Sequence, residues 1–82
     1  MLDATINLGE GDSMKLSARN ILKGKILTVR KGTTTAHVLI QLPGGAIITS
    51  SITNEAVDEL GLANGQDAYA VIKASDVMVG RD

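Results

Sequence analysis

Three short clusters of polar side chains interrupt an otherwise aliphatic chain at points where strands would carry apolar residues. The first is Ser17-Ala18-Arg19-Asn20, in which alternation along an extended segment puts the Ser17 hydroxyl and the Arg19 guanidinium on one face. The second is Thr49-Ser50-Ser51-Ile52-Thr53, whose four hydroxyls run into a predicted helix N-terminus. The third is Lys73-Ala74-Ser75, which follows an apolar run and contains the only cation between residues 54 and 80.

Each of these clusters also has an ordinary structural explanation. Ser and Thr at strand ends commonly cap turns, and a Lys at a strand end commonly extends its ammonium group into water. Taken together, however, the clusters supply what a small tetrahedral dianion needs: one or two cations, several hydroxyl donors and backbone N–H groups. The sequence therefore indicates a binding site for an oxyanion.

The charged residues are unevenly distributed, although the formal net charge is only −1. Residues 13–54 contain no Asp or Glu, and the acids lie at the two ends of the chain. A basic segment inside a nearly neutral protein suggests an anionic partner, and a solvated strand face is the alternative explanation. The cations of this segment are Lys15, Arg19, Lys23, Lys25, Arg30 and Lys31.

No catalytic constellation is visible in the sequence. The chain has no Cys and a single His, His37, so zinc modules, thiol chemistry, disulfide scaffolds and multi-His sites are excluded. The basic segment has no paired carboxylates, and no phosphate-cradling glycine-rich loop precedes a helix. We therefore expect a binding protein and not an enzyme, with no catalytic cofactor and no free metal cation.

The elements that must position these clusters are mostly short strands separated by turn residues. Thr53 is a good N-cap for a two-turn helix that Gly61 would end. This order predicts an all-β fold, a small five-stranded OB-like barrel with one short helix between the fourth strand and the last. The expected strands are Lys15–Asn20, Lys25–Arg30, Ala36–Leu42, Ala46–Ile52 and Asp67–Lys73, the last of them continuing after a break as Asp76–Val79.

The chain is short enough to form only one domain. We expect a flexible leader over residues 1–13 and the domain over residues 14–82. A small aliphatic core with no disulfide favours stabilisation by oligomerisation. No apolar run approaches the roughly 20 residues of a membrane span, and the N-terminus lacks the pattern of a signal peptide, so we expect a cytoplasmic protein without a membrane partner.

The same residues resemble the molbindins, the Mop-type molybdate-binding proteins of the TOBE/Mop domain family. The resemblance covers residues 15–79 and does not include the leader. It rests on five motifs in the same order, namely Ser17-Ala-Arg-Asn20 with Leu22-Lys-Gly24, Thr35-Ala-His-Val-Leu-Ile, Gly44-Gly45, the segment from Ile52 to Leu62, and Ala70-Val-Ile-Lys-Ala-Ser-Asp-Val-Met78.

The resemblance implies an OB-like barrel assembled as a hexamer, a trimer of dimers, that holds molybdate or tungstate at subunit interfaces. It implies oxyanion contacts from Ser17 and Arg19 of one subunit and from Thr53 and Lys73 of a neighbour. The resemblance also implies that four more residues contact the oxyanion through their backbone or hold its ligands in place, namely Ala18, Asn20, Ala74 and Ser75. Some relatives have a Ser three residues after the Thr, where this chain has Ala56, and Ser50, Ser51 or water would have to replace that hydroxyl.

The resulting hypothesis is intracellular storage or buffering of molybdate. One alternative is a regulatory ligand-binding module of a molybdate transporter or a transcription factor. Another is a nucleic-acid-binding OB module, which we disfavour because Tyr69 is the only aromatic residue available for base stacking.

Overall fold

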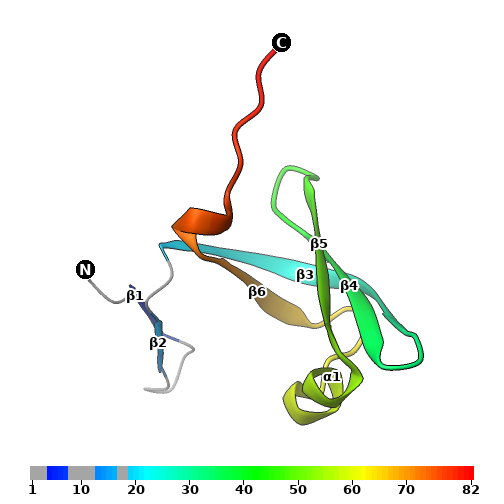
Figure 1. Cartoon of the computed structure of the whole chain (residues 1–82). Coiled ribbons are helices and arrows are strands. Elements are labelled where there is room, and N and C mark those ends of the chain that lie inside the picture. The colour runs from blue at the N-terminus through cyan, green and yellow to red at the C-terminus, as the bar shows by residue number, and fades with distance from the viewer. Residues whose placement is uncertain (1–3, 8–12, 17–18) are drawn as a thin grey trace. The chain divides into compact units, whose positions relative to one another are not determined.

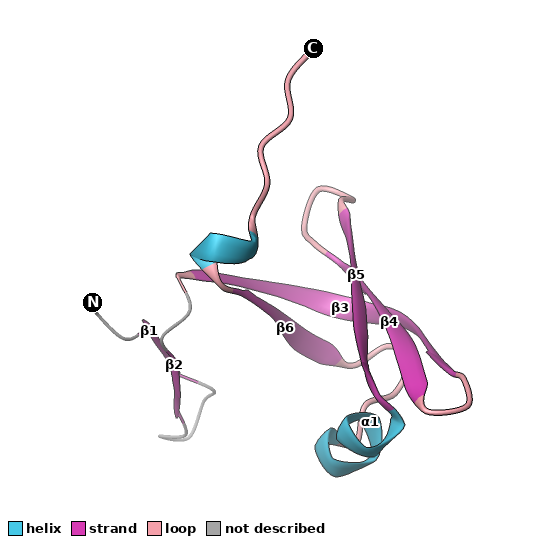
Figure 2. Cartoon of the chain, viewed as in Figure 1, coloured by secondary structure: helices cyan, strands magenta, loops and turns pink. Residues whose placement is uncertain are grey.

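The computed structural model of the chain describes residues 4–7, 13–16 and 19–82. Residues 22–70 form one compact unit, called here the sheet unit, and residues 1–21 together with 71–82 form the terminal unit. Figure 2 shows that the described residues are mostly strands, with helical turns only in α1 and in one short 3-10 helix. The elements are β1 (Ala4–Asn7), β2 (Ser13–Leu16), β3 (Asn20–Lys31), β4 (Thr35–Gln41), β5 (Ile47–Thr53), α1 (Asn54–Leu60), β6 (Asp67–Ile72) and the 3-10 helix Ala74–Asp76.

The main sheet has four strands in the order β5-β4-β3-β6 (Figure 1). β4 is antiparallel to both of its neighbours, β3 and β5. The hairpin between β4 and β5 turns at Gly44 and Gly45, whose φ values of 95° and 102° favour glycine, and the Leu42 carbonyl accepts from Gly45 N at 3.0 Å. The expected strands Ala36–Leu42 and Ala46–Ile52, separated by a turn, thus correspond to β4 and β5.

The two faces of the sheet differ in burial, and this difference follows the alternation along β4 and β5. The face that carries Val38 and Ile40 is called here the core face, and the opposite, exposed face the outer face. Ile26 on β3, Ile40 on β4 and Ile48 on β5 lie opposite one another in register on the core face. The buried core residues are Ile26, Ala36, Val38, Ile40, Val57 and Ala70.

Two local features shape β3. Gly24 is buried, and a Cβ at this position would lie 2.6 Å from both the Gln41 carbonyl oxygen and the Ile40 Cγ2 atom. Only glycine therefore permits this approach of β3 to β4. A register shift between Ile26 and Thr28 marks a β-bulge, which leaves Leu27 exposed.

Helix α1 begins and ends where the sequence predicted. Thr53 is the N-cap, and its Oγ1 accepts a hydrogen bond from the Ala56 N–H at 3.0 Å. Gly61 ends the helix in the left-handed conformation, with φ 63° and ψ 39°. Val57 is buried in the hydrophobic core, so α1 packs on the core face of the sheet. None of the described helices is long and apolar enough to cross a membrane.

The prediction of five sheet strands is wrong for the described residues, because the main sheet has four. The expected first strand, Lys15–Asn20, is not continuous: β2 ends at Leu16, β3 begins at Asn20, and β2 pairs with β1 in a separate two-stranded sheet. The expected strand Asp76–Val79 is also absent, since Ala74–Asp76 forms a 3-10 helix and no strand follows it. The all-β class with one short helix is confirmed.

The N-terminal segment contains regular structure that was not predicted from the sequence. Ala4 pairs with Leu16, and Asn7 pairs with Ser13, in an antiparallel hairpin. The domain boundary at residue 14 stays a prediction.

Candidate functional site

The structure brings two of the three polar clusters together in the terminal unit. Asn20, the first residue of β3, donates a hydrogen bond from Nδ2 to the Ile72 carbonyl at 3.3 Å. Ile72 is the last residue of β6, so this bond places Arg19 and Asn20 beside the start of the segment Lys73–Ser75. The predicted ligands Ser17 and Ala18 lie outside the described residues.

The segment after β6 has a conformation suited to an anion. Lys73 is extended, with φ −63° and ψ 139°, and precedes the 3-10 helix Ala74–Asp76. Inside that turn, the Asp76 N–H donates to the Lys73 carbonyl at 2.9 Å. The first N–H groups of a helical turn have no partner within it, and no hydrogen bond among the described residues uses those of Ala74 and Ser75. The turn therefore offers an ammonium group, a hydroxyl and two backbone donors, with the carboxylate of Asp76 as the one local repulsive group.

Arg19 and Lys73 are exposed, and neither belongs to an ion pair among the described residues. The ion pairs found there join Lys23 and Lys25 to Asp67, and Lys31 to Asp58. Two cations without a local carboxylate partner can give their full charge to a ligand, because no existing pair has to be broken first.

Thr53 lies in the sheet unit, at the end of β5. Its Oγ1 is used as an acceptor by the Ala56 N–H at 3.0 Å. A hydroxyl also has one proton to donate, and the cap bond does not use it. The side chain is exposed, so Thr53 can cap α1 and at the same time donate to an anion. Ala56, which has no hydroxyl, takes part in this arrangement through its backbone only.

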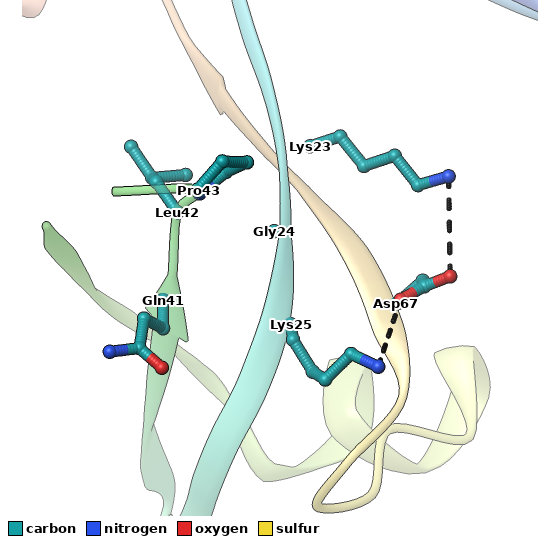
Figure 3. A pocket seen from close by; sticks show the side chains of 7 residues that line it. All are labelled: Lys23, Gly24, Lys25, Gln41, Leu42, Pro43 and Asp67. Atoms are coloured by element: carbon teal, nitrogen blue, oxygen red, sulfur yellow. Dashed lines mark ion pairs between the residues drawn. The ribbon is translucent and has the colours of Figure 1, made fainter. Parts of the chain in front are cut away.

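The cleft of the sheet unit was not predicted from the sequence (Figure 3). It has a volume of about 320 Å³ and is lined by Lys23, Gly24, Lys25, Gln41, Leu42, Pro43 and Asp67. Both lysines point toward Asp67, with Nζ–Oδ distances of 4.0 Å from Lys23 and 3.8 Å from Lys25. The i, i+2 spacing of Lys23 and Lys25 indicates that both lie on one face of a strand. The sequence does not indicate that Asp67, about forty residues away, lies between their ammonium groups.

This cleft is less suited to a dianion than the clusters described above. The carboxylate of Asp67 lies between the two ammonium groups and would repel an anion that approached them both. Because all three side chains are exposed, the pairs contribute less than about 1 kcal/mol each to stability. In the described part of the chain, no group of three or more His, Asp or Glu residues could hold a metal ion.

Comparison with known proteins agrees with these features. The sequence profile of the TOBE domain matches residues 16–79. The chain is 49% identical over 67 residues to a protein of Haemophilus influenzae described as a probable molybdenum-pterin-binding protein, covering 82% of this chain and 97% of that one.

Two solved structures are also similar to the chain. One is MopII from Clostridium pasteurianum, with a TM-score of 0.77 and 45% identity, covering 80% of this chain and 98% of that chain. The other is the cytoplasmic molybdate-binding protein ModG with molybdate bound, with a TM-score of 0.77 and 47% identity, covering 93% of this chain and 52% of that chain. As the resemblance predicted, the chain belongs to the TOBE domain family, among its Mop-type molybdate-binding proteins.

Proposed function

We propose that this protein binds molybdate or tungstate between subunits of a homo-oligomer and thereby stores or buffers molybdenum in the cytoplasm. The observation that carries the proposal is the hydrogen bond from Asn20 Nδ2 to the Ile72 carbonyl, at 3.3 Å. It holds the segment that contains Arg19 next to the segment that contains Lys73 of the same chain, so two cation-bearing segments from distant parts of the sequence are neighbours.

The side chains and backbone of these two segments match what a tetrahedral oxyanion needs. Arg19 and Lys73 supply positive charge, the Ser75 hydroxyl can donate, and the backbone of Ala74 and Ser75 adds N–H donors. We propose that these donors hold the anion through hydrogen bonds, so that the role is binding without catalysis or a catalytic cofactor. Molybdate and tungstate are nearly identical in size and charge, and the same donors suit both.

Several features of the main sheet and its surroundings support an oligomer. β5 and β6 are the edge strands of the sheet, and an edge strand has unpaired backbone groups on one side. Among the residues whose burial the structure describes, the core consists of six aliphatic residues, while several large apolar side chains are exposed, among them Leu22, Leu27, Ile47 and Leu60. Small domains with this balance are commonly stabilised by association. We propose the hexamer, a trimer of dimers, that the family resemblance implies, with Thr53 and Lys73 of one subunit facing Ser17 and Arg19 of another.

Native mass spectrometry of the purified protein, with and without molybdate, tests assembly and stoichiometry together. We expect a hexamer that gains a fixed number of oxyanions. A protein that remains monomeric at micromolar concentration and takes up no molybdate would overturn the proposal. Titration calorimetry with molybdate, tungstate and a single-stranded oligonucleotide then distinguishes an oxyanion site from a nucleic-acid-binding surface, for which we expect no heat of binding with the oligonucleotide.

A further inference from the structure

The two serines of β5 lie on opposite faces of the sheet. Ser51 is exposed on the outer face together with Thr53, two residues further along the strand. Ser50 is half-buried on the core face, where it lies opposite Val38. Of the two hydroxyls that might compensate for Ala56, only that of Ser51 therefore points to the same side of the sheet as Thr53.

The neighbouring strands place further polar side chains in register with Ser51; residues that are register partners across the sheet are called here a row. His37 on β4 is the register partner of Ser51, and Arg30 on β3 is the register partner of His37. One row further along, Thr35 is the register partner of Thr53. All of these side chains are exposed. An imidazole and a hydroxyl thus lie directly opposite each other, one row from the predicted oxyanion ligand Thr53.

The spacing of these rows suits one small anion. Residues two apart on a strand are separated by about 6.6 Å, and a diagonal cross-strand pair such as His37 and Thr53 by about 7–8 Å. A tetrahedral anion that accepts one hydrogen bond of about 2.8 Å from each of the two side chains spans such a separation. Helix α1 does not cover the rows, because Val57 packs it against the core face.

We propose that Ser51 and His37 are further oxyanion-binding residues of this protein, which extend the site from Thr53 along the outer face of the sheet. This inference rests on the proposed function and deepens it. The Ser51 hydroxyl supplies the donor that Ala56 lacks, and the His37 ring donates through an N–H group. Arg30, next in the row, adds positive charge at longer range.

The charged groups around the His37 row favour an anion. The nearest charged side chain in this row is Arg30 of β3, while Lys23 and Lys25 lie further along the same strand, and Asp67 on β6 pairs with those lysines. Strands β3, β4 and β5 carry no carboxylate, and the acids of α1 belong to an element on the other face. The His37 row therefore offers an anion hydrogen-bond donors and positive charge, with no acid in the row to repel it.

The sharpest test replaces Ser51 by two residues of the same shape. Ser51→Thr keeps a hydroxyl, whereas Ser51→Val removes it, and both are favoured in strands. In titration calorimetry we expect near wild-type molybdate affinity for Ser51→Thr and roughly tenfold weaker binding for Ser51→Val, since a hydrogen bond to a charged group is worth that much or more. Ser50→Ala is the matched control on the core face, and it should change the affinity less than about twofold.

His37 is tested by a matched pair of variants. His37→Gln keeps an N–H donor, whereas His37→Leu removes it. In titration calorimetry at one fixed pH, we expect His37→Gln to bind molybdate within about threefold of the wild type and His37→Leu to bind it roughly tenfold more weakly.

The outcomes separate this inference from the proposed function. If wild-type protein does not bind molybdate, the proposed function fails. If it binds, but Ser51→Val titrates like Ser51→Thr and His37→Leu titrates like His37→Gln, then Ser51 and His37 are not ligands, while the function stands. Circular dichroism of each variant verifies that the strands are retained, and native mass spectrometry verifies the assembly.

Discussion

Replacing Lys73 by Ala tests the proposed site most directly. In the structure the Lys73 ammonium is exposed, lies next to the segment that Asn20 anchors, and has no carboxylate partner among the described residues. Its removal therefore breaks no ion pair of the described chain, and its effect on binding reports its interaction with the ligand.

The expected magnitude follows from the charged hydrogen bond that the Lys73 ammonium would donate to the oxyanion. A hydrogen bond to a charged group contributes about 1.5–3 kcal/mol, and about 1.4 kcal/mol corresponds to a tenfold change in affinity. Lys73→Ala should thus weaken molybdate binding by about 10- to 100-fold, and Arg19→Ala should do the same. The matched control is Lys25→Ala, which removes the same charge from another exposed lysine, whose ammonium lies 3.8 Å from Asp67. It should change the affinity less than about twofold at physiological ionic strength.

The assay is titration calorimetry at fixed ionic strength, supported by thermal melts with and without molybdate. Cations that converge on an empty site repel one another, so ligand-free Lys73→Ala should melt at the wild-type temperature or slightly above it. Molybdate should protect the wild type against heat and protect the variant much less, whereas sulfate, which is smaller, should protect neither well. Wild-type affinity in both Lys73→Ala and Arg19→Ala would show that the anion is held elsewhere.

Three further predictions follow from other parts of the chain. Thr53→Asp keeps the oxygen acceptor that caps α1 but replaces the hydroxyl donor by a negative charge. The melting temperature should therefore stay close to that of the wild type, while calorimetry should detect no molybdate binding. If the variant still binds molybdate, Thr53 is not part of the site. Gly24→Ala places a Cβ 2.6 Å from the Gln41 carbonyl oxygen and should lower the free energy of unfolding in denaturant by about 1–3 kcal/mol. A Cβ at Gly80 meets nothing within 4 Å, so Gly80→Ala should leave the free energy of unfolding almost unchanged. Equal stabilities of the two variants would contradict the close approach of β3 and β4. Deletion of residues 1–13 removes a hairpin strand that does not pair with the main sheet, so sedimentation and calorimetry should show unchanged assembly and binding, and a large fall in melting temperature would refute this.

The part of the fold that the sequence predicts best is the segment in which local signals agree. Along β4 and β5, strict alternation coincides with the glycine turn between them, and the N-cap Thr53 and the left-handed Gly61 bound α1. Each signal acts over a few residues, so no long-range information was needed.

The ends of the chain are predicted less well, because there pairing partners decide the structure. The sequence pattern makes β2 the beginning of the first sheet strand, but β2 pairs with β1, and only the structure shows which strands are neighbours. The residues after β6 alternate enough to suggest a strand, yet the 3-10 turn at Ala74–Asp76 closes through local hydrogen bonds. Such choices between competing partners are not visible in a local pattern.

In the candidate site, too, local residue types were predictable and long-range contacts were not. The residue types of the three clusters were sufficient to predict the chemistry of the ligand. The placement of Asn20, which follows Arg19, beside Ile72, which precedes Lys73, depends on a hydrogen bond between residues 52 apart in the sequence. The assignment of Ser51 to the outer face and of Ser50 to the core face depends on the register of β5 with β4. Residue types thus indicate which groups can bind an anion, and register decides which of them can do so together.

The outer face of β5 gives a physical reason why anion binding and assembly would occur at one surface. Thr49, Ser51 and Thr53 make this face of an edge strand polar but uncharged. Covering such hydroxyls in an interface is unfavourable unless each finds a partner, and an oxyanion supplies several strong acceptors at once. A ligand held in this way stabilises only the assembled protein, by about 2.7 kcal/mol at a free concentration about one hundred times its dissociation constant. Under the proposed function, molybdate would act as part of the interface, and its concentration would set the stability of the assembly.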